Sequence, residues 1–216
     1  MDEMLRSEEM QEHIHAGDFR LAFIGMSNCG KSYRSKVLVR EADFFWYEVD
    51  KEIQKKLWFS SMEEISHWLG EPSDTDFEQR EKIYLEKEEQ CTYLKYLDTK
   101  GKNLVFDTTG SVICLSNETK SWLKNECLIV NIDVGIDAIP AMLEKYLEEP
   151  KPVSWNGMLD VRPGESQRES LERCYPKLLI DRLQKYKKFA HITIPAEELK
   201  DTSAQETIEV IKKYLP

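Results

Sequence analysis

The 216-residue chain lacks several features that would place it in a particular class of protein. It has no apolar run near the ~18 residues needed to cross a bilayer, and residues 1–4 are acidic, so we expect neither a membrane span nor a targeting signal. Basic residues are too few to favour nucleic acid, since 30 Lys and Arg face 40 Asp and Glu for a net charge of −10. We therefore expect a cytoplasmic protein with a small-molecule ligand, a monomer or small homo-oligomer. The lysine-rich run at 185–188 is interpreted as a solvated helix face.

Paired cysteines and clustered histidines are also missing. The five cysteines are scattered without C-x-x-C spacing, and the four histidines have no ligand spacing, so neither a disulfide framework nor a zinc site is indicated. Cys29 has two interpretations, a thiol of lowered pKa or an unreactive small residue, and we favour the second. The length predicts one domain over residues 19–216, preceded by a tail or short helix over 1–18.

A complete phosphate-binding loop is present at residues 25–32, which read GMSNCGKS directly after an apolar run. In this pattern glycines let the backbone wrap an anion, and successive N–H groups converge on phosphates at a helix N-terminus. Lys31 would reach the β- and γ-phosphates, and the Ser32 hydroxyl would ligate Mg²⁺. We expect ATP with Mg²⁺, and the predicted nucleotide contacts are Gly25, Met26, Ser27, Asn28, Cys29, Gly30, Lys31, Ser32 and Tyr33.

Short apolar runs alternate with longer helical patterns, which is typical of an α/β fold with a parallel sheet. The strands are expected at 20–24, 44–49, 103–106, 128–133 and 191–194. The helices are expected at 31–42, 50–57, 61–69, 76–98, 117–125, 136–148, 167–189 and 204–215. Ser60 or Ser61 followed by Glu63 or Glu64 predicts a capped helix start.

The periodic pattern breaks at about residues 149–166, a segment rich in proline and glycine that carries Lys151 and Arg162. A loop of more than ~12 residues in a compact domain is often functional, so we predict a lid that excludes water from the γ-phosphate. The alternative is an ordinary long surface loop.

Acidic residues follow two of the expected strands. Glu48 and Asp50 end the second strand, where alternate spacing would point both side chains the same way, and Asp107 ends the third. Phosphoryl transfer needs a Mg²⁺-positioning acid and a base near the acceptor hydroxyl, usually at the carboxyl ends of parallel strands. We predict Glu48 and Asp107 as metal-side acids and Asp50 as catalytic, the alternative for each being a helix cap or first-turn acid.

Over about residues 20–216 the chain resembles the shikimate kinase family. The segments that carry the resemblance, beyond the phosphate loop, are residues 45–53, Phe77 with Glu81, 110–112, 151–153 and 172–176. The resemblance implies a P-loop NTPase fold with a five-stranded parallel sheet flanked by helices and a lid. It also implies an active site that transfers phosphate from ATP, with Mg²⁺ as cofactor.

The resemblance further implies individual roles. Lys31 and Ser32 would hold phosphates and Mg²⁺, and Glu48 would assist the metal. Asp50 would hold or deprotonate the acceptor hydroxyl, and Lys151 would steady the transferring phosphoryl group. The predicted substrate contacts, by matching position, are Asp50, Glu78, Gly110 and Arg173.

Two positions differ from the family pattern. Glu78 stands where the family has a substrate-binding arginine, and a carboxylate there would repel a carboxylate substrate. Thr108 and Thr109 replace two glycines of a three-glycine run beside the substrate. We therefore expect an ATP-dependent kinase whose acceptor is not shikimate. The alternatives are a nucleotide-binding regulatory module without transfer activity, and shikimate kinase proper, with Arg80 or a lid cation replacing the missing arginine.

Overall fold

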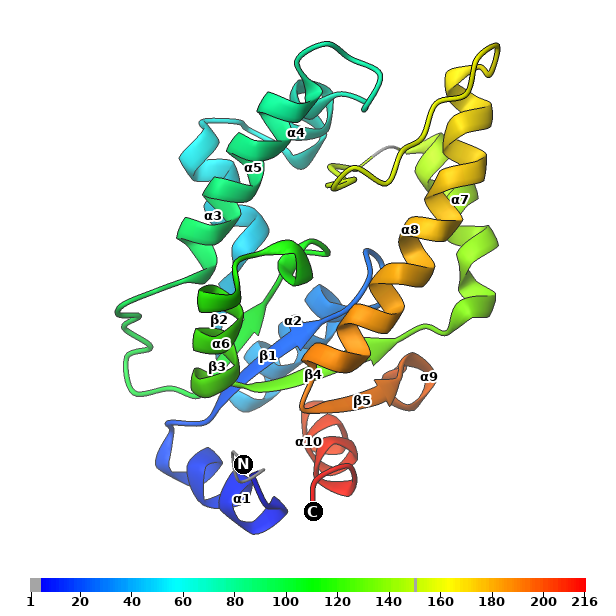
Figure 1. Cartoon of the computed structure of the whole chain (residues 1–216). Coiled ribbons are helices and arrows are strands. Elements are labelled where there is room, and N and C mark those ends of the chain that lie inside the picture. The colour runs from blue at the N-terminus through cyan, green and yellow to red at the C-terminus, as the bar shows by residue number, and fades with distance from the viewer. Residues whose placement is uncertain (1–4, 150) are drawn as a thin grey trace.

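The molecule is built on a five-stranded parallel sheet with the order β2-β3-β1-β4-β5 (Figure 1). This computed structural model describes residues 5–149 and 151–216. The strands are β1 Arg20–Ile24, β2 Phe45–Glu48, β3 Leu104–Asp107, β4 Leu128–Asp133 and β5 Ile192–Pro195. All five expected strands and the parallel arrangement are confirmed. Because β1 lies in the middle, the loop that follows it emerges at the centre of the sheet's carboxyl edge.

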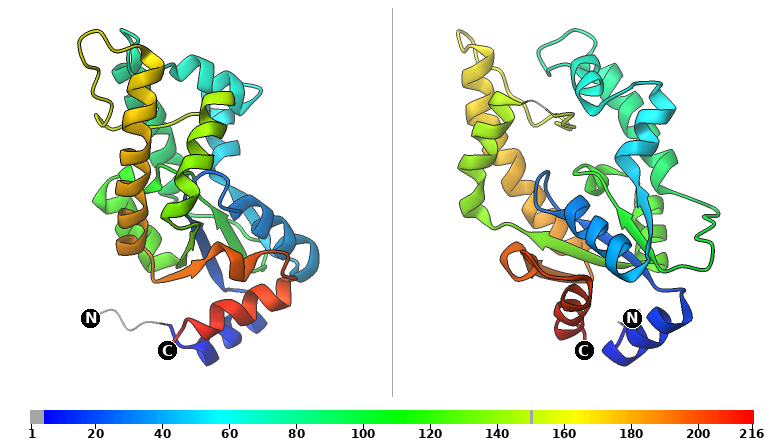
Figure 2. Two further views of the ribbon diagram at one scale, coloured as in Figure 1. Left: turned by 90° about the vertical axis from the view of Figure 1, so that its right-hand side faces the viewer. Right: turned by 180° about the vertical axis from the view of Figure 1, so that it is seen from behind.

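Helices cover both faces and rise above the carboxyl edge of the sheet (Figures 1 and 2). The helices are α1 Ser7–Ala16, α2 Lys31–Ala42, α3 Val49–Leu57, α4 Met62–Leu69, α5 Phe77–Thr92, α6 Asn117–Glu126, α7 Ile139–Glu148, α8 Gln167–Phe189, α9 Ala196–Leu199 and α10 Ala204–Lys213, with short 3₁₀ turns η1 Val112–Cys114 and η2 Ile136–Ala138. In Figure 1, α3, α4 and α5 stand on one side above the sheet, and α7 and α8 stand on the other.

Alternation along the strands divides the core in two, one part on each face of the sheet. In β1, Ala22 and Ile24 belong to the cluster that packs under α3, α5, α6 and α8. Leu21 and Phe23 belong to the cluster on the opposite face, with α2 and α10. Both faces are covered, as a parallel sheet requires. The central strand is therefore buried on both faces.

Several element boundaries differ from the sequence-based expectation by one to three residues, and a larger difference is at the end of α5. The helix predicted at 76–98 ends at Thr92, because Tyr93 turns to an extended conformation and packs edge-on against Trp122, with ring centroids 5.6 Å apart. The strand predicted at 44–49 ends at Glu48, and Val49 already begins α3. The capped start is confirmed at Ser61, whose side chain accepts a hydrogen bond from the Glu64 N–H.

The N-terminal segment from residue 5 folds onto the body of the protein. Helix α1 buries Met10 completely against the cluster that holds α10. Asn103 ties this helix to the sheet, since its amide oxygen accepts from the Phe19 N–H (3.0 Å) and its nitrogen donates to the Ile14 carbonyl (3.0 Å). Within residues 5–149 and 151–216, no helix is long and apolar enough to cross a membrane.

Asn103→Ala should lower the free energy of unfolding by about 1–3 kcal/mol, because it leaves the buried Phe19 N–H without its acceptor and removes one of the two donors to the Ile14 carbonyl. Urea denaturation measures the change. Lys102→Ala removes only an exposed ion pair with Asp43, so this control should cost less than about 0.5 kcal/mol. Equal stability of the two variants would show that Asn103 does not anchor α1.

Candidate active site

The phosphate-binding loop connects β1 to α2 at the centre of the carboxyl edge (Figure 1). Gly25 has φ +138°, and a Cβ there would lie 2.8 Å from the Ile132 carbonyl oxygen, so only glycine fits. Gly30, at φ +104°, is the N-cap residue that precedes α2. The Lys31 ammonium donates to the carbonyls of Gly25 and Met26, at 2.9 Å each. The predicted loop is thus folded around its own lysine.

A cavity of about 1040 Å³ lies above this loop, between the two groups of helices. Most of the predicted nucleotide contacts line it, namely Met26, Ser27, Asn28, Gly30, Lys31, Ser32 and Tyr33. Gly25 and Cys29 are not among the lining residues. Burial raises the pKa of the Cys29 thiol, which agrees with an unreactive small residue rather than an activated one.

Two of the predicted acids, Glu48 and Asp107, are neighbours across β2 and β3, where the register pairs them directly. Asp107 is buried, and its Oδ2 atom has no hydrogen-bond partner among the described residues. Burial raises the pKa of Asp107, while Lys31 and the Ser32 hydroxyl oppose the rise. Burial and the Asp107 charge also raise the pKa of Glu48. Neither side chain lines the cavity.

Asp50 lines the cavity from the first turn of α3. Burial raises its pKa to about 6, and Lys31 is the main charge that opposes this. Since α3 begins at Val49, the extended conformation does not continue, and the prediction of one shared direction for Glu48 and Asp50 rested on a wrong premise. The helix places Asp50 in the cavity, while Glu48 stays beside Asp107 at the strand end.

The predicted metal-side residues fit a magnesium ion only in company with phosphate. Within the described part of the chain, no group of three or more His, Cys, Asp or Glu side chains could hold a metal ion. The Ser32 hydroxyl and the Asp107 carboxylate instead interact with each other, and the Asp107 Oδ2 atom has no partner among the described residues. Mg²⁺ bound through one or two carboxylates plus substrate phosphates needs no fuller protein cage.

The segment predicted as a lid lies over the cavity. The Lys151 ammonium donates to the Asn28 side-chain oxygen at 2.8 Å, and Lys151, Pro152, Val153 and Ser154 line the cavity. Glu81 on α5 accepts from the Ser154 hydroxyl (3.0 Å) and the Asn156 N–H (2.9 Å). Trp155 is buried against Tyr146 and Tyr175, so it anchors the segment. Pro150 lies outside the described residues.

Gly110 lines the cavity as predicted, but two other predicted substrate contacts do not. Glu78 is exposed on the outer side of α5. Arg173 is paired with Glu165 (2.6 Å) and donates to the Asp160 carbonyl. Arg80, on which the alternative of shikimate kinase proper depended, pairs with Asp76 (3.2 Å). The cations expected to hold a carboxylate are thus engaged outside the cavity.

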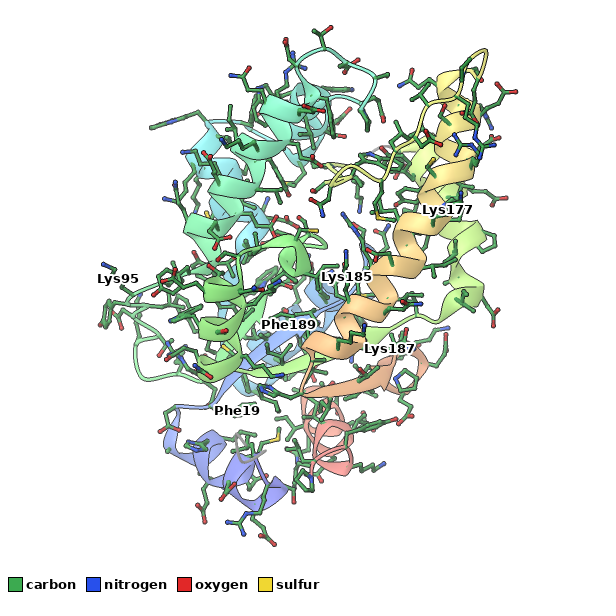
Figure 3. The ribbon with its side chains drawn as sticks, in the orientation of Figure 1. Phe19, Lys95, Lys177, Lys185, Lys187 and Phe189 are labelled. Atoms are coloured by element: carbon green, nitrogen blue, oxygen red, sulfur yellow. The ribbon has the colours of Figure 1, made fainter. Side chains whose placement is uncertain are left out.

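The lysine run on α8 also lies outside the cavity. Lys185 and Lys187 point away from the helix in Figure 3, and they pair with Asp181 (2.7 Å) and Asp133 (2.9 Å). The interpretation of a charged helix face agrees with this arrangement.

Sequence reasoning missed a buried polar cluster in the wall of the cavity. Its members are Tyr84, Glu88, Thr109, Ser111 and Arg182, all of which line the cavity except Glu88, which lies behind the wall. Glu88 shares the buried stripe of α5 with Phe77, Tyr84 and Cys91, and Arg182 shares that of α8 with Leu178 and Tyr186. A charged residue on an otherwise apolar helix face was the signal that could have revealed both.

Comparison with a family model shows the family, and comparison with solved structures shows the fold. The family model described as "Shikimate kinase" matches residues 27–212. The structure is similar to three solved shikimate kinases, with 16% identity to that of Bacteroides thetaiotaomicron (TM-score 0.53), 19% to that of Acinetobacter baumannii in complex with shikimate (0.54) and 22% to that of Aquifex aeolicus (0.53). These matches cover 90%, 92% and 89% of this chain and 97%, 96% and 93% of the others. At such identity they show the fold. No curated protein matches the chain in sequence.

Glu88 should make stability fall as pH rises. Burial raises its pKa to about 7, although hydrogen bonds from Ser111 and Thr109 oppose this. The folded state therefore holds the proton more tightly than the unfolded state, and the stability this contributes is present below pH ~4.5 and lost by about pH 7. Between those values the stability of the wild type relative to Glu88→Gln should drop by a few kcal/mol, at ~1.4 kcal/mol per pKa unit.

Urea denaturation across that pH range measures the effect, with Glu89→Gln as the matched control on the same helix. Burial acts to raise the pKa of Glu89, but hydrogen bonds from Ser116 and Thr119 hold it below its usual value. The contribution of Glu89 to stability therefore has the opposite pH dependence. If the free energy of unfolding changed with pH in the same way in the wild type and in Glu88→Gln, the raised pKa of Glu88 would be contradicted.

Proposed function

The chain belongs to the shikimate kinase family, and we propose that it is an ATP-dependent kinase that phosphorylates a hydroxyl of a small metabolite other than shikimate. The family is one of phosphotransferases that use ATP and act on a hydroxyl group. The observation that carries the proposal is that Asp50 and Lys31 line one cavity, which joins a phosphate-binding loop to a carboxylate able to receive a hydroxyl proton.

In the proposed reaction the loop N–H groups and Lys31 bind the β- and γ-phosphates of ATP. Ser32 and Asp107, with Glu48 beside them, would hold Mg²⁺, which would neutralise charge on the phosphates. Asp50 would orient the acceptor hydroxyl and take its proton as the oxygen attacks the γ-phosphorus and ADP leaves. Above pH 6 Asp50 is mostly ionised and able to act as this base.

The 151–166 segment would complete the site. Lys151 reaches the phosphate loop at Asn28, a position from which its charge can steady the transferring phosphoryl group. The bonds from Ser154 and Asn156 to Glu81 span the cavity and support a role in excluding water. We place the reaction in the cytoplasm, where the five free cysteines would stay reduced.

We propose an acceptor other than shikimate because the arginines expected to bind the shikimate carboxylate are missing or paired elsewhere. Glu78 stands in place of the family's arginine, and Arg80 and Arg173 are engaged with Asp76 and Glu165. Thr108 and Thr109 fill space that glycines leave open in the family pattern. Both side chains are buried at the cavity wall, so they narrow the acceptor end.

Lys31→Ala should abolish transfer and weaken ATP binding, whereas Asp50→Asn should leave ATP affinity within about threefold and lower kcat by ~10²–10⁴-fold. The reason is that Lys31 contacts phosphates and Asp50 acts only on the acceptor. ADP release from Mg-ATP with a panel of hydroxylated acceptors measures transfer, and calorimetry measures ATP binding.

Glu52→Gln, on the same helix as Asp50 and paired with Lys55, is the control and should behave as the wild type. Undiminished transfer in Asp50→Asn would remove that residue from the mechanism. Tight ATP binding by the wild type, with no acceptor-stimulated release, would favour the regulatory module over the kinase.

A further inference from the structure

The buried carboxylate of Glu88 organises the acceptor end of the cavity from behind its wall. Glu88 is 0% exposed on α5, and each of its oxygens accepts one hydroxyl proton, from Thr109 Oγ1 and from Ser111 Oγ. The Ser111 N–H also donates to Thr109 Oγ1 at 3.0 Å. Thr109 and Ser111 both line the cavity, so Glu88 fixes the orientation of two polar groups that a ligand would meet.

This arrangement decides what the two hydroxyls can offer. A hydroxyl group can donate one hydrogen bond and accept two. The Thr109 and Ser111 hydroxyls each donate their one hydrogen bond to the ionised Glu88 carboxylate. The oxygens, 3.2 Å apart, can then only accept hydrogen bonds from a ligand. A ligand with neighbouring hydroxyl groups supplies such donors, whereas an ionised carboxylate has no proton to give.

The charges at this end of the cavity also disfavour an acidic ligand. Glu88 lies directly behind the two hydroxyls and Asp50 lines the same cavity, while the Arg182 guanidinium donates to the Ser154 carbonyl at 2.6 Å. The lysines that act on Asp50, Lys31 and Lys151, are bonded to the phosphate loop, where the phosphates of ATP would engage them. A carboxylate placed against Thr109 and Ser111 would therefore face the like charge of Glu88, which disfavours its binding.

We propose that Glu88, acting through Thr109 and Ser111, makes this site select a neutral polyhydroxylated acceptor over a carboxylic acid. The inference rests on the proposed kinase function and narrows its substrate class. Glu88 is a positioning residue, since it touches the two hydroxyls and lies behind the residues that line the cavity.

The proposal gives acceptor binding a pH dependence. The titratable and charged groups around Glu88 are Tyr84 and Cys91 on α5, Asp50 on α3, Cys114 on η1, and Arg182 and Tyr186 on α8. When Glu88 takes up a proton, it must donate to one hydroxyl and turn that group round, which removes one acceptor position. The KM for a neutral polyol should therefore fall as pH rises through about 7, and Glu88→Gln should lose that change.

The first arm of the test compares acceptors that differ at one carbon, which carries a neutral hydroxyl in one and a charged carboxylate in the other. Sorbitol and gluconate, and glycerol and glycerate, are pairs in which a terminal CH₂OH is replaced by a carboxylate; shikimate and myo-inositol extend the panel. With Mg-ATP and the wild type, kcat/KM should favour the neutral member by at least about tenfold. Turnover confined to carboxylates would overturn the inference and leave the kinase standing. No turnover with any acceptor would be a failure of the proposed function, and the inference would fall with it.

The second arm uses variants. Glu88→Gln, Thr109→Val and Ser111→Ala should each raise the acceptor KM about tenfold while the KM for ATP stays within about twofold. Glu89→Gln changes a carboxylate on the same helix that also accepts two hydroxyl protons, from Ser116 and Thr119, and it should leave the acceptor KM unchanged. Equal acceptor KM values and pH profiles for Glu88→Gln and Glu89→Gln would contradict the proposal, since a merely structural role would affect both alike.

Discussion

The structure depends on one buried cation placed among carboxylates at the carboxyl edge of the sheet. Lys31 is 8% exposed, donates to the carbonyls of Gly25 and Met26, and opposes the effect of burial on the pKa of both Asp50 and Asp107. Without it, the two buried acids would lose the main positive charge beside them, and the Gly25 and Met26 carbonyls would lose a donor. The same ammonium that holds the loop together is the group that phosphates would attract, so folding and nucleotide binding depend on one side chain.

The sheet order explains how the other groups reach this cation. Placing β1 between β3 and β4 brings the phosphate loop beside Asp107, and pairing β2 with β3 adds Glu48. Because α3 begins directly after β2, Asp50 lies in the first turn of that helix and lines the cavity. The lid segment and α5 are joined through Glu81, and Tyr84 from α5 and Arg182 from α8 line the cavity, with Glu88 behind its wall. The cavity wall beyond the phosphate loop is thus built from side chains of several elements, whereas the loop itself offers mainly backbone N–H groups.

The sequence predicted the part of the site that depends on local pattern. The phosphate loop, the strands and α2 and α8 follow from glycine spacing and apolar periodicity, and the structure has them where they were expected. The residues beyond the phosphate loop are brought together by the packing of one helix face against another. A local sequence pattern does not predict which helix faces pack together. Arg173 has the right neighbours in sequence yet pairs with Glu165, while Glu88 and Arg182 have no motif and are brought to the cavity by tertiary packing. The Glu48 and Asp50 spacing was judged on strand geometry, and a helix began one residue earlier than the prediction allowed.

The central claim is that the γ-phosphate of ATP is delivered to a hydroxyl and not to water. Phosphorus NMR of the wild type with Mg-ATP and a mixture of neutral polyols measures the fate of that phosphate directly. The account predicts a phosphate monoester signal that grows as the γ-phosphate signal disappears, with little inorganic phosphate. Conversion of ATP to ADP and inorganic phosphate alone, with the ester absent at every acceptor concentration, would contradict it.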